Sequence, residues 1–280
     1  MTRFLAVTSA VLLTVLPVSS APQAAPDAPS LVRDWQCRFD AVARESYVVD
    51  ADWVRVLTAN GARSTGTLRF ASTPRGEMYF RVPRSTDPND KRTRELAFDG
   101  KTLTASINED IFNRMSRPQN ISGPISAVYQ FHYGFAFAPS RILVNPALRS
   151  EKTPTEMGKR ITSVQRVSPN RVRAVLSRTE ADGARVPSSI DFVRRDGSYF
   201  PKKFTYAYSD GNTEVIFDEI KPFGSHALPT RYRYIQQSTS PNPEESSVTT
   251  YTLRYRRVAD KSLFRLRPTA NQRVVRDESR

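Results

Sequence analysis

The sequence has few of the residues on which metal, thiol or histidine chemistry depends. Its 280 residues include one cysteine, Cys37, and two histidines, His132 and His226. A lone cysteine cannot form an intrachain disulfide, and neither a cysteine pair nor a histidine triad is available for a zinc site. We expect Cys37 to be a small buried hydrophobic residue rather than a reactive thiol.

Motifs for common enzyme and nucleotide sites are also missing. The chain has no G-x-S-x-G elbow, no P-loop and no dinucleotide-binding glycine motif. Its adjacent carboxylate pairs, Glu109-Asp110 and Asp218-Glu219, would point to opposite faces of a strand, which suits them poorly to acid–base catalysis. The sequence therefore predicts no catalysis, no cofactor and no metal site. A hydrolase whose site is dispersed along the chain remains a third alternative.

Only one long hydrophobic run is present, and it lies near the N-terminus. A basic start precedes the apolar run from Phe4 to Val18, and small residues follow it. This order predicts a cleaved secretory signal over residues 1–20, because the run is shorter than the roughly 20 residues of a membrane-spanning helix. A Pro/Ala-rich linker over residues 21–30 would follow. We expect residues 31–280 to form a single β domain in the periplasm.

The charge is strongly positive. The chain holds 42 Lys and Arg against 28 Asp and Glu, a formal net charge of +14. Such a balance suits an acidic partner such as lipid headgroups or anionic glycans, whereas an exported protein rarely meets nucleic acid, which we do not expect as a partner. The arginines are also scattered over most of the chain, as they would be on the solvated faces of strands.

Apolar residues recur at helical spacing from Leu31 to Ala43. Ser30 directly precedes this stripe and is the predicted N-cap. The sequence thus predicts a helix over 31–43, and the first strand is expected to begin at Tyr47.

Asn-Gly and Asp-Gly dipeptides separate stretches in which apolar and polar residues alternate. Hairpins of type I′ need positive φ at both central positions, which these dipeptides tolerate. The alternation predicts a long antiparallel meander with one wet face, and a sheet of this length should coil toward a barrel. The dipeptides begin at Asn60, Asp99, Asp182, Asp196 and Asp210.

Residues 118–140 contain no charged side chain, although 25% of the chain is charged. The prolines and glycines of this segment, with Gln130 and His132, argue against a membrane span. One interpretation is an apolar lid over the hollow of the sheet, where it would touch a greasy ligand. The alternative is a crossover segment that fills the core, and the pattern alone favours this alternative. The lid residues expected to contact ligand are Val128, Tyr129, Phe131, Phe135 and Phe137.

Two segments resemble a known family. The run from Lys261 to Val275 is similar to the close of the LolA-type outer-membrane lipoprotein carriers, with a Phe-centred strand, a Pro and a hydrophobic pair. Residues 95–103 are similar to the family's strand, Asp-Gly turn and strand. The resemblance implies a mainly β protein with a few helices, built as an incomplete antiparallel β-barrel: a half-barrel meander with an N-terminal helix and a helical, aromatic lid. It also implies a lid latch on an early strand, for which Arg55 and Arg69 are the candidates.

The expected function is that of an exported monomeric carrier, which holds acyl chains of a lipid or lipoprotein in an apolar concave cavity without catalysis. A membrane surface or an envelope protein is the expected additional partner. The alternative is an envelope interaction module that binds an anionic polymer or a protein through its Arg-rich face. The inner-face residues expected to line the cavity are Phe80, Leu103, Phe204, Tyr206 and Tyr251.

Overall fold

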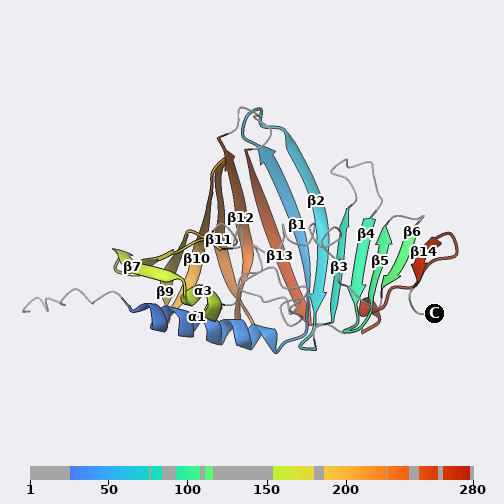
Figure 1. The fold of residues 1–280 in the computed structure, drawn as a ribbon, viewed down its shortest axis with the longest axis horizontal. Helices are drawn as coiled ribbons and strands as arrows, with labels where there is room; N and C mark the ends of the chain where they lie inside the picture. The colour runs from blue at the N-terminus through green and yellow to red at the C-terminus, as the bar shows by residue number, and fades with distance from the viewer. Residues whose placement is uncertain are drawn as a thin grey trace, which may run out of the picture.

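In the computed structural model, one large sheet and a few short helical elements make up the described part of the chain (Figure 1). The predicted signal, residues 1–20, and the predicted lid, residues 118–140, lie outside it. The described residues are 26–75, 77–83, 93–107, 111–115, 154–179, 186–224, 226–239, 246–257 and 261–277.

The strands of the first half are β1 Tyr47–Leu57, β2 Arg63–Ser72, β3 Met78–Pro83, β4 Thr93–Phe98, β5 Leu103–Ile107 and β6 Ile111–Met115. Those of the second half are β7 Ile161–Ser168, β8 Arg171–Leu176, β9 Ser189–Arg195, β10 Ser198–Tyr208, β11 Gly211–Phe223, β12 His226–Ser238, β13 Ser247–Arg257 and β14 Arg273–Asp277. The helical elements are α1 Ala28–Ala43, α3 Pro154–Gly158 and a 3₁₀ turn, η6, Lys261–Phe264. No described helix is long and apolar enough to cross a membrane.

The strands form a single 14-stranded sheet in the order β14-β6-β5-β4-β3-β2-β1-β13-β12-β11-β10-β9-β8-β7. Two meanders therefore meet where β1 pairs with β13, over the full register from Tyr47↔Arg257 to Leu57↔Ser247. All pairs are antiparallel except β14 with β6, which is parallel. The sheet curves but does not close, with β7 and β14 at its edges (Figure 1). The predicted open, half-barrel meander is thus confirmed.

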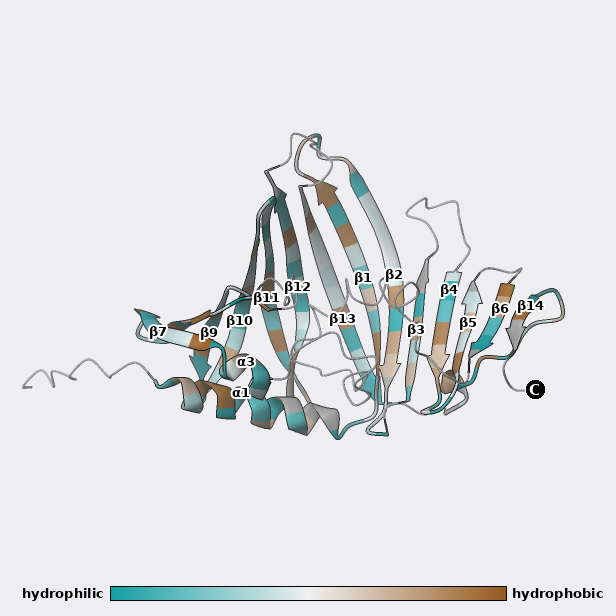
Figure 2. Cartoon of the chain, viewed as in Figure 1, coloured by the Kyte–Doolittle hydropathy of each residue, from teal (hydrophilic) through white to brown (hydrophobic). Residues whose placement is uncertain are grey.

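Apolar and polar residues alternate along the strands, which gives the two faces of the sheet different chemistry. Figure 2 shows hydrophobic and hydrophilic bands alternating along β1. We call the inner face the one that bears Val49, Ala51 and Phe70, which belong to the main apolar core. The outer face bears their neighbours in sequence, such as Asp50 and Arg69, which lie opposite each other across β1 and β2. This arrangement follows from the two-residue period of a strand.

Helix α1 packs against the second half of the sheet, with contacts to β7, β10 and β12. Trp35 buries its indole against Phe192 and Phe204, with ring centroids 5.9 and 5.7 Å away. Asp34 fixes the helix to β10, because its Oδ2 accepts a hydrogen bond from the backbone N–H of Tyr199 at 3.0 Å. One apolar stripe and one carboxylate thus determine where α1 lies.

Two predictions about α1 are wrong. The helix begins at Ala28, inside the predicted linker, and its N-cap is Asp27 rather than Ser30: Asp27 Oδ1 accepts a hydrogen bond from the backbone N–H of Ser30 at 2.8 Å. Cys37 is exposed rather than buried, because it lies off the stripe that contains Leu31 and Trp35.

Among the described turns, those at Asn60, Asp99, Asp196 and Asp210, the type I′ prediction is met at one dipeptide, and Asp182-Gly183 lies outside the described residues. At Asp196-Gly197 both residues have positive φ, 48° and 80°. At Asp99-Gly100 only the glycine does, because Asp99 Oδ1 instead accepts hydrogen bonds from the N–H groups of Lys101 and Thr102, which defines a wider turn. The side chain of Asn60 acts similarly toward Ala62.

The C-terminal segment covers part of the outer face. Phe264 is buried there against Val48, Tyr79 and their neighbours in a small second apolar cluster. The expected Phe-centred strand is therefore wrong: Phe264 lies in η6, and the strand β14 begins later, at Arg273.

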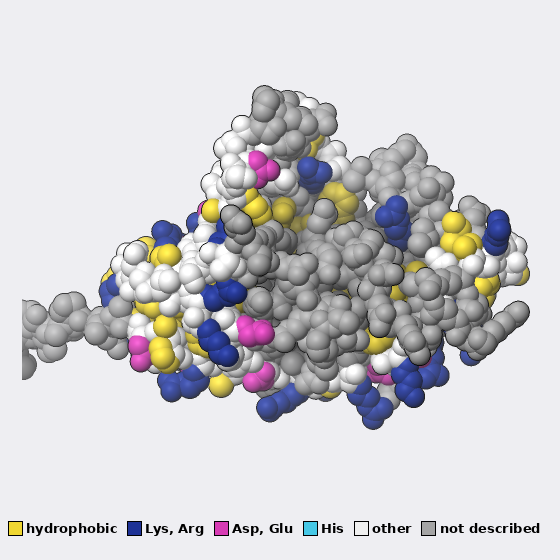
Figure 3. Space-filling model, viewed as in Figure 1, with side chains coloured by type: hydrophobic (Ala, Val, Ile, Leu, Met, Phe, Trp, Pro, Cys, Tyr) yellow, Lys and Arg dark blue, Asp and Glu magenta, His cyan; other side chains and the backbone are white. Residues whose placement is uncertain are grey.

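Charged side chains on the rest of the outer face bind one another across the strands. Figure 3 shows the side of the molecule on which α1 lies, and there too Lys and Arg are spread out rather than gathered in one patch. Opposite charges at cross-strand positions stabilise a sheet by roughly 0.2–1 kcal/mol a pair. The pairs are Arg69 and Arg256 with Asp50, Arg254 with Asp52, Arg81 with Glu95, Arg171 and Arg173 with Asp191, Lys203 with Glu214, and Arg233 with Asp218.

Asp191 is the most enclosed member of this network. Its side chain is fully buried, and Arg173 Nε and Arg171 Nη2 donate to it at 2.6 and 2.9 Å. Burial by itself would raise the pKa of Asp191, but the hydrogen bond and charge of Arg173, with the charges of Lys203 and Arg171, hold the pKa below its ordinary value.

We predict that Asp191→Asn lowers the free energy of unfolding by about 2 kcal/mol, because it removes charge-assisted hydrogen bonds from a buried site. The matched variant Asp52→Asn, whose ion pair is exposed, should cost less than about 1 kcal/mol. Since the folded-state pKa of Asp191 is lowered, its stabilisation is present above about pH 4 and is lost as the pH falls further. The difference in the free energy of unfolding between wild type and Asp191→Asn should therefore be smaller at pH 3 than at neutral pH, as measured by urea unfolding. Equal losses for the two variants at neutral pH would contradict the prediction.

Candidate functional site

The inner face joins the predicted cavity residues into one apolar surface. All of them are buried members of the main core cluster, contributed by strands from both meanders. Their contact with a ligand stays a prediction. In strand order from β3 to β13, these residues are Phe80, Leu103, Phe204, Tyr206 and Tyr251. The remaining predicted ligand contacts, Val128, Tyr129, Phe131, Phe135 and Phe137, lie outside the described residues.

A row of aromatic rings crosses the inner face from α1 toward β1. Beyond Trp35, the ring of Phe204 meets Phe217 edge-on at 5.9 Å, and Phe217 meets Tyr232 at 6.2 Å. Tyr232 stacks on Tyr251 with centroids 4.5 Å apart. These rings form a continuous apolar floor, on which flat or linear hydrocarbon could lie.

The floor turns polar toward the ends of the strands that lie farther from α1. Past Tyr251, the next inner-face position on β13 is Thr249, which faces Tyr234 on β12 and Arg55 on β1. Thr213 on β11 faces Tyr206 across β10 and β11. Hydroxyl groups and one guanidinium thus replace hydrocarbon within the same curved face.

Trp53 lies at the border between the two zones. It pairs with Tyr251 on one side and with Gly66 on the other. A Cβ at position 66 would come within 2.5 Å of the Trp53 indole, so only glycine lets the indole lie against β2. The indole Nε1 is buried and has no hydrogen-bond partner, which is uncommon for a buried donor.

The two candidate latch arginines lie on opposite faces. Arg69 is on the outer face, where its Nε donates to Asp50 Oδ1 at 2.6 Å. Arg55 is on the inner face and half-buried, in register with Thr249. Of the two, only Arg55 is placed to meet anything that occupies the inner face.

Burial raises the pKa of Tyr234 and of Tyr251, and the nearby charge of Arg55 partly offsets the increase in both. Both phenols therefore remain protonated at neutral pH. They can act as hydrogen-bond donors beside the guanidinium of Arg55.

A small polar cavity of about 190 Å³ adjoins Tyr234. Its walls come from the ends of β10, β11 and β12, and they combine aromatic rings with amides and hydroxyl groups. The lining residues are Tyr208, Asp210, Gly211, Asn212, Thr213, Tyr234, Gln236, Gln237 and Ser238.

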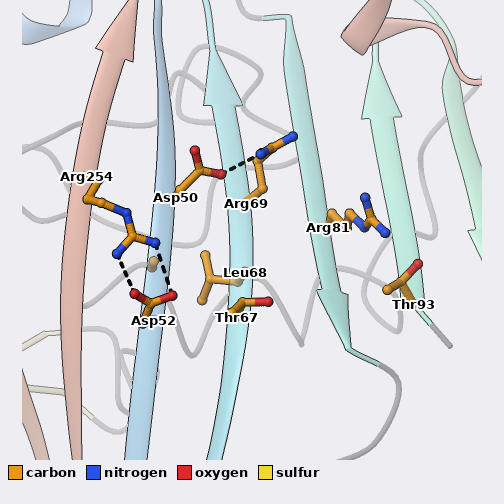
Figure 4. A pocket seen from close by; sticks show the side chains of 9 residues that line it. Asp50, Asp52, Thr67, Leu68, Arg69, Arg81, Thr93 and Arg254 are labelled. Atoms are coloured by element: carbon orange, nitrogen blue, oxygen red, sulfur yellow. Dashed lines mark hydrogen bonds and ion pairs between the residues drawn. The ribbon is translucent and has the colours of Figure 1, made fainter. Parts of the chain in front are cut away.

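A larger cleft, of about 490 Å³, opens on the outer face (Figure 4). Asp50 and Arg69 bind each other within it, and so do Asp52 and Arg254. Arg81 on its wall has a carboxylate partner on β4. Because these charges already satisfy one another, the cleft offers little to an ionic ligand.

Within the described residues, no group of three or more His, Cys, Asp or Glu side chains could hold a metal ion. The sequence had indicated the aromatic floor through alternation in β10 and β13. It gave no indication of the polar zone around Thr249 and Tyr234, because that zone depends on which strand follows β1 across the sheet.

No protein-family model and no curated protein matches the sequence. Among solved structures, the chain is similar to a LolA superfamily protein from Nitrosomonas europaea, with a TM-score of 0.47 and 10% identity over 83% of this chain and 97% of the other. A DUF1329 family protein from Desulfovibrio piger gives 0.48 and 11%, over 86% and 98%. A putative outer membrane lipoprotein-sorting protein domain from Vibrio parahaemolyticus gives 0.45 and 9%, over 85% and 97%.

We predict that Gly66→Ala displaces the Trp53 indole and lowers the free energy of unfolding by about 1–3 kcal/mol, the usual cost of overpacking. The matched change Gly61→Ala lies in the open turn before β2, where an added Cβ meets nothing within 4 Å but the positive φ of 68° costs strain. The tryptophan emission maximum should therefore shift for Gly66→Ala only, while chemical unfolding measures a lower free energy of unfolding for both variants. An unchanged spectrum for Gly66→Ala would contradict this packing.

Proposed function

We propose that the protein is an exported periplasmic carrier that holds an acyl chain of a lipid or lipoprotein against the inner face of its sheet, as a monomer and without chemical turnover. The observation that carries this proposal is the continuous apolar floor of an open sheet, from Leu103 on β5 to Phe204 on β10. Side chains from both meanders contribute to it, so the floor exists only in the folded chain.

The energetics support a chain-like ligand. Burial of each methylene contributes about 0.8 kcal/mol, so a chain of about 16 carbons gains roughly 12 kcal/mol. Loss of translational and rotational freedom costs about 4–15 kcal/mol. A single acyl chain could thus bind with useful but moderate affinity. Contacts to its polar head would supply the rest of the binding free energy.

The alternative function, an envelope module that binds anionic polymer or protein through an Arg-rich face, has less support. The paired outer-face arginines already contact carboxylates, as Arg254 and Asp52 do, and a polyanion would have to displace them. The two functions differ in salt dependence: exposed charge pairs weaken steeply as ionic strength rises, whereas acyl burial does not.

We predict that the gently purified protein carries lipid or acylated peptide detectable by mass spectrometry, and that it binds a fluorescent fatty acid. Ala105→Leu adds bulk to the buried inner face of β5. It should lower the affinity for the fatty acid at least about fivefold, because the larger side chain obstructs the floor. Thr65→Leu adds similar bulk to an exposed position on the outer side of β2 and should leave binding unchanged.

Thermal unfolding identifies variants that fail to fold, and Ala174→Leu on β8 provides a second obstructing change on the same face. If the purified protein carries no lipid or acylated peptide and does not bind the fatty acid, the carrier proposal is overturned. Equal effects of Ala105→Leu and Thr65→Leu would show that the ligand does not lie on the inner face.

A further inference from the structure

We infer that the inner face contains an anion subsite centred on Arg55, which binds the carboxylate or phosphate head of the acyl ligand. The inference rests on the proposed carrier function and specifies its ligand as an amphiphile with a negative head. It assigns to Arg55 contact with the ligand itself.

Arg55 differs from the paired arginines of the outer face in having no counter-ion among the described residues. It is half-buried on β1, and within the described part of the chain it makes no hydrogen bond and no ion pair. Outer-face residues at the same sheet centre, such as Arg69 and Arg254, each bind a carboxylate. A cation removed from water without a partner costs free energy, so a bound anion is the simplest explanation of its position.

The residues around Arg55 are hydrogen-bond donors. Thr249 lies opposite it in the β1–β13 register, and its side chain is buried. Tyr234 and Tyr251 are close enough for the charge of Arg55 to affect their pKa values. Two positions earlier on the same face of β1, the buried indole N–H of Trp53 has no partner. Guanidinium, hydroxyl and indole groups together suit an oxyanion.

The inner face near Arg55 also lacks competing negative charge. The inner-face positions of β1, β11, β12 and β13 carry no Asp or Glu, because the carboxylates of these strands point outward. Among the residues that line the polar cavity, the one carboxylate is that of Asp210, in the turn between β10 and β11. An anion is therefore expected on the Arg55 side of Tyr234, with neutral parts of the head toward the cavity.

The position of Arg55 also fits the shape of an amphiphile. The apolar floor begins beneath α1 at Trp35 and leads through Phe217 and Tyr232 to Tyr251. Arg55 lies one inner-face position beyond the Trp53–Tyr251 pair, on β1. A chain on the floor would thus place its head at Arg55, and its terminal methyl group toward α1.

The test compares single-chain probes with different heads on the full protein. The probes are a fluorescent polyene fatty acid and its methyl ester, and, by displacement, a lysophosphatidic acid and a neutral monoacylglycerol. The variants are Arg55→Gln, Arg55→Lys and the control Arg63→Gln, which removes the same charge from an exposed outer-face position on β2. Circular dichroism and thermal unfolding establish that each variant folds.

Wild type should bind each anionic probe about 10- to 100-fold more tightly than its neutral partner, the range given by a charge-assisted hydrogen bond. Arg55→Gln should abolish this preference while retaining the affinity for the neutral probes, Arg55→Lys should restore part of it, and Arg63→Gln should preserve it. The probe pair with the larger preference identifies carboxylate or phosphate as the natural head.

Three outcomes would overturn the inference. If Arg55→Gln keeps the preference, Arg55 does not contact the head, and the carrier function stands. If Arg63→Gln loses as much as Arg55→Gln, overall charge rather than a subsite attracts the anion. If wild type binds none of the four probes, the carrier proposal fails and the subsite fails with it.

Discussion

The register between β1 and β13 is the constraint on which the rest of the molecule depends. It joins two meanders that are far apart in the sequence, and it sets which residues of both strands share a face. A slip of β13 by one residue against β1 would bring Arg254 inward and turn Tyr251 outward, which would break the aromatic row and separate Arg254 from Asp52. The apolar floor, the polar zone beyond it and the paired outer face are therefore consequences of a single alignment.

The outer ion pairs help to hold that alignment. In the described residues, eight Lys and Arg side chains bind six carboxylates across neighbouring strands. Each exposed pair contributes little by itself, yet a slip of one residue would place the paired charges of β1 and β13 on opposite faces of the sheet. The ion pairs therefore contribute more to the choice of strand register than to the total free energy of unfolding. It also means that the net charge of +14 overstates how strongly this face would attract an anion.

The sequence was sufficient for the periodic parts of the fold and insufficient where local hydrogen bonds compete. Alternation of period two predicts the strands and the sidedness of Phe204 and Tyr206, because it is a property of each strand alone. The helix start was misplaced because Asp27 and Ser30 are both good caps, and only the folded chain shows which one accepts the bond. The polar zone was missed because it combines residues of strands that adjoin only after β1 pairs with β13.

Arg55 is a half-buried cation without a counter-ion among the described residues, and its position needs an explanation. If this arginine served only solubility or register, we would expect it on the outer face, where Asp50 and Asp52 of the same strand bind arginines. On the inner face it is half-buried, beside Thr249, the buried phenol of Tyr251 and the partly buried phenol of Tyr234, and the described residues provide no counter-ion. An unpaired charge in such surroundings opposes folding, so its retention is best explained by a benefit that arises on binding. An acyl chain with a negative head provides that benefit, because its hydrocarbon matches the floor and its head neutralises the guanidinium of Arg55.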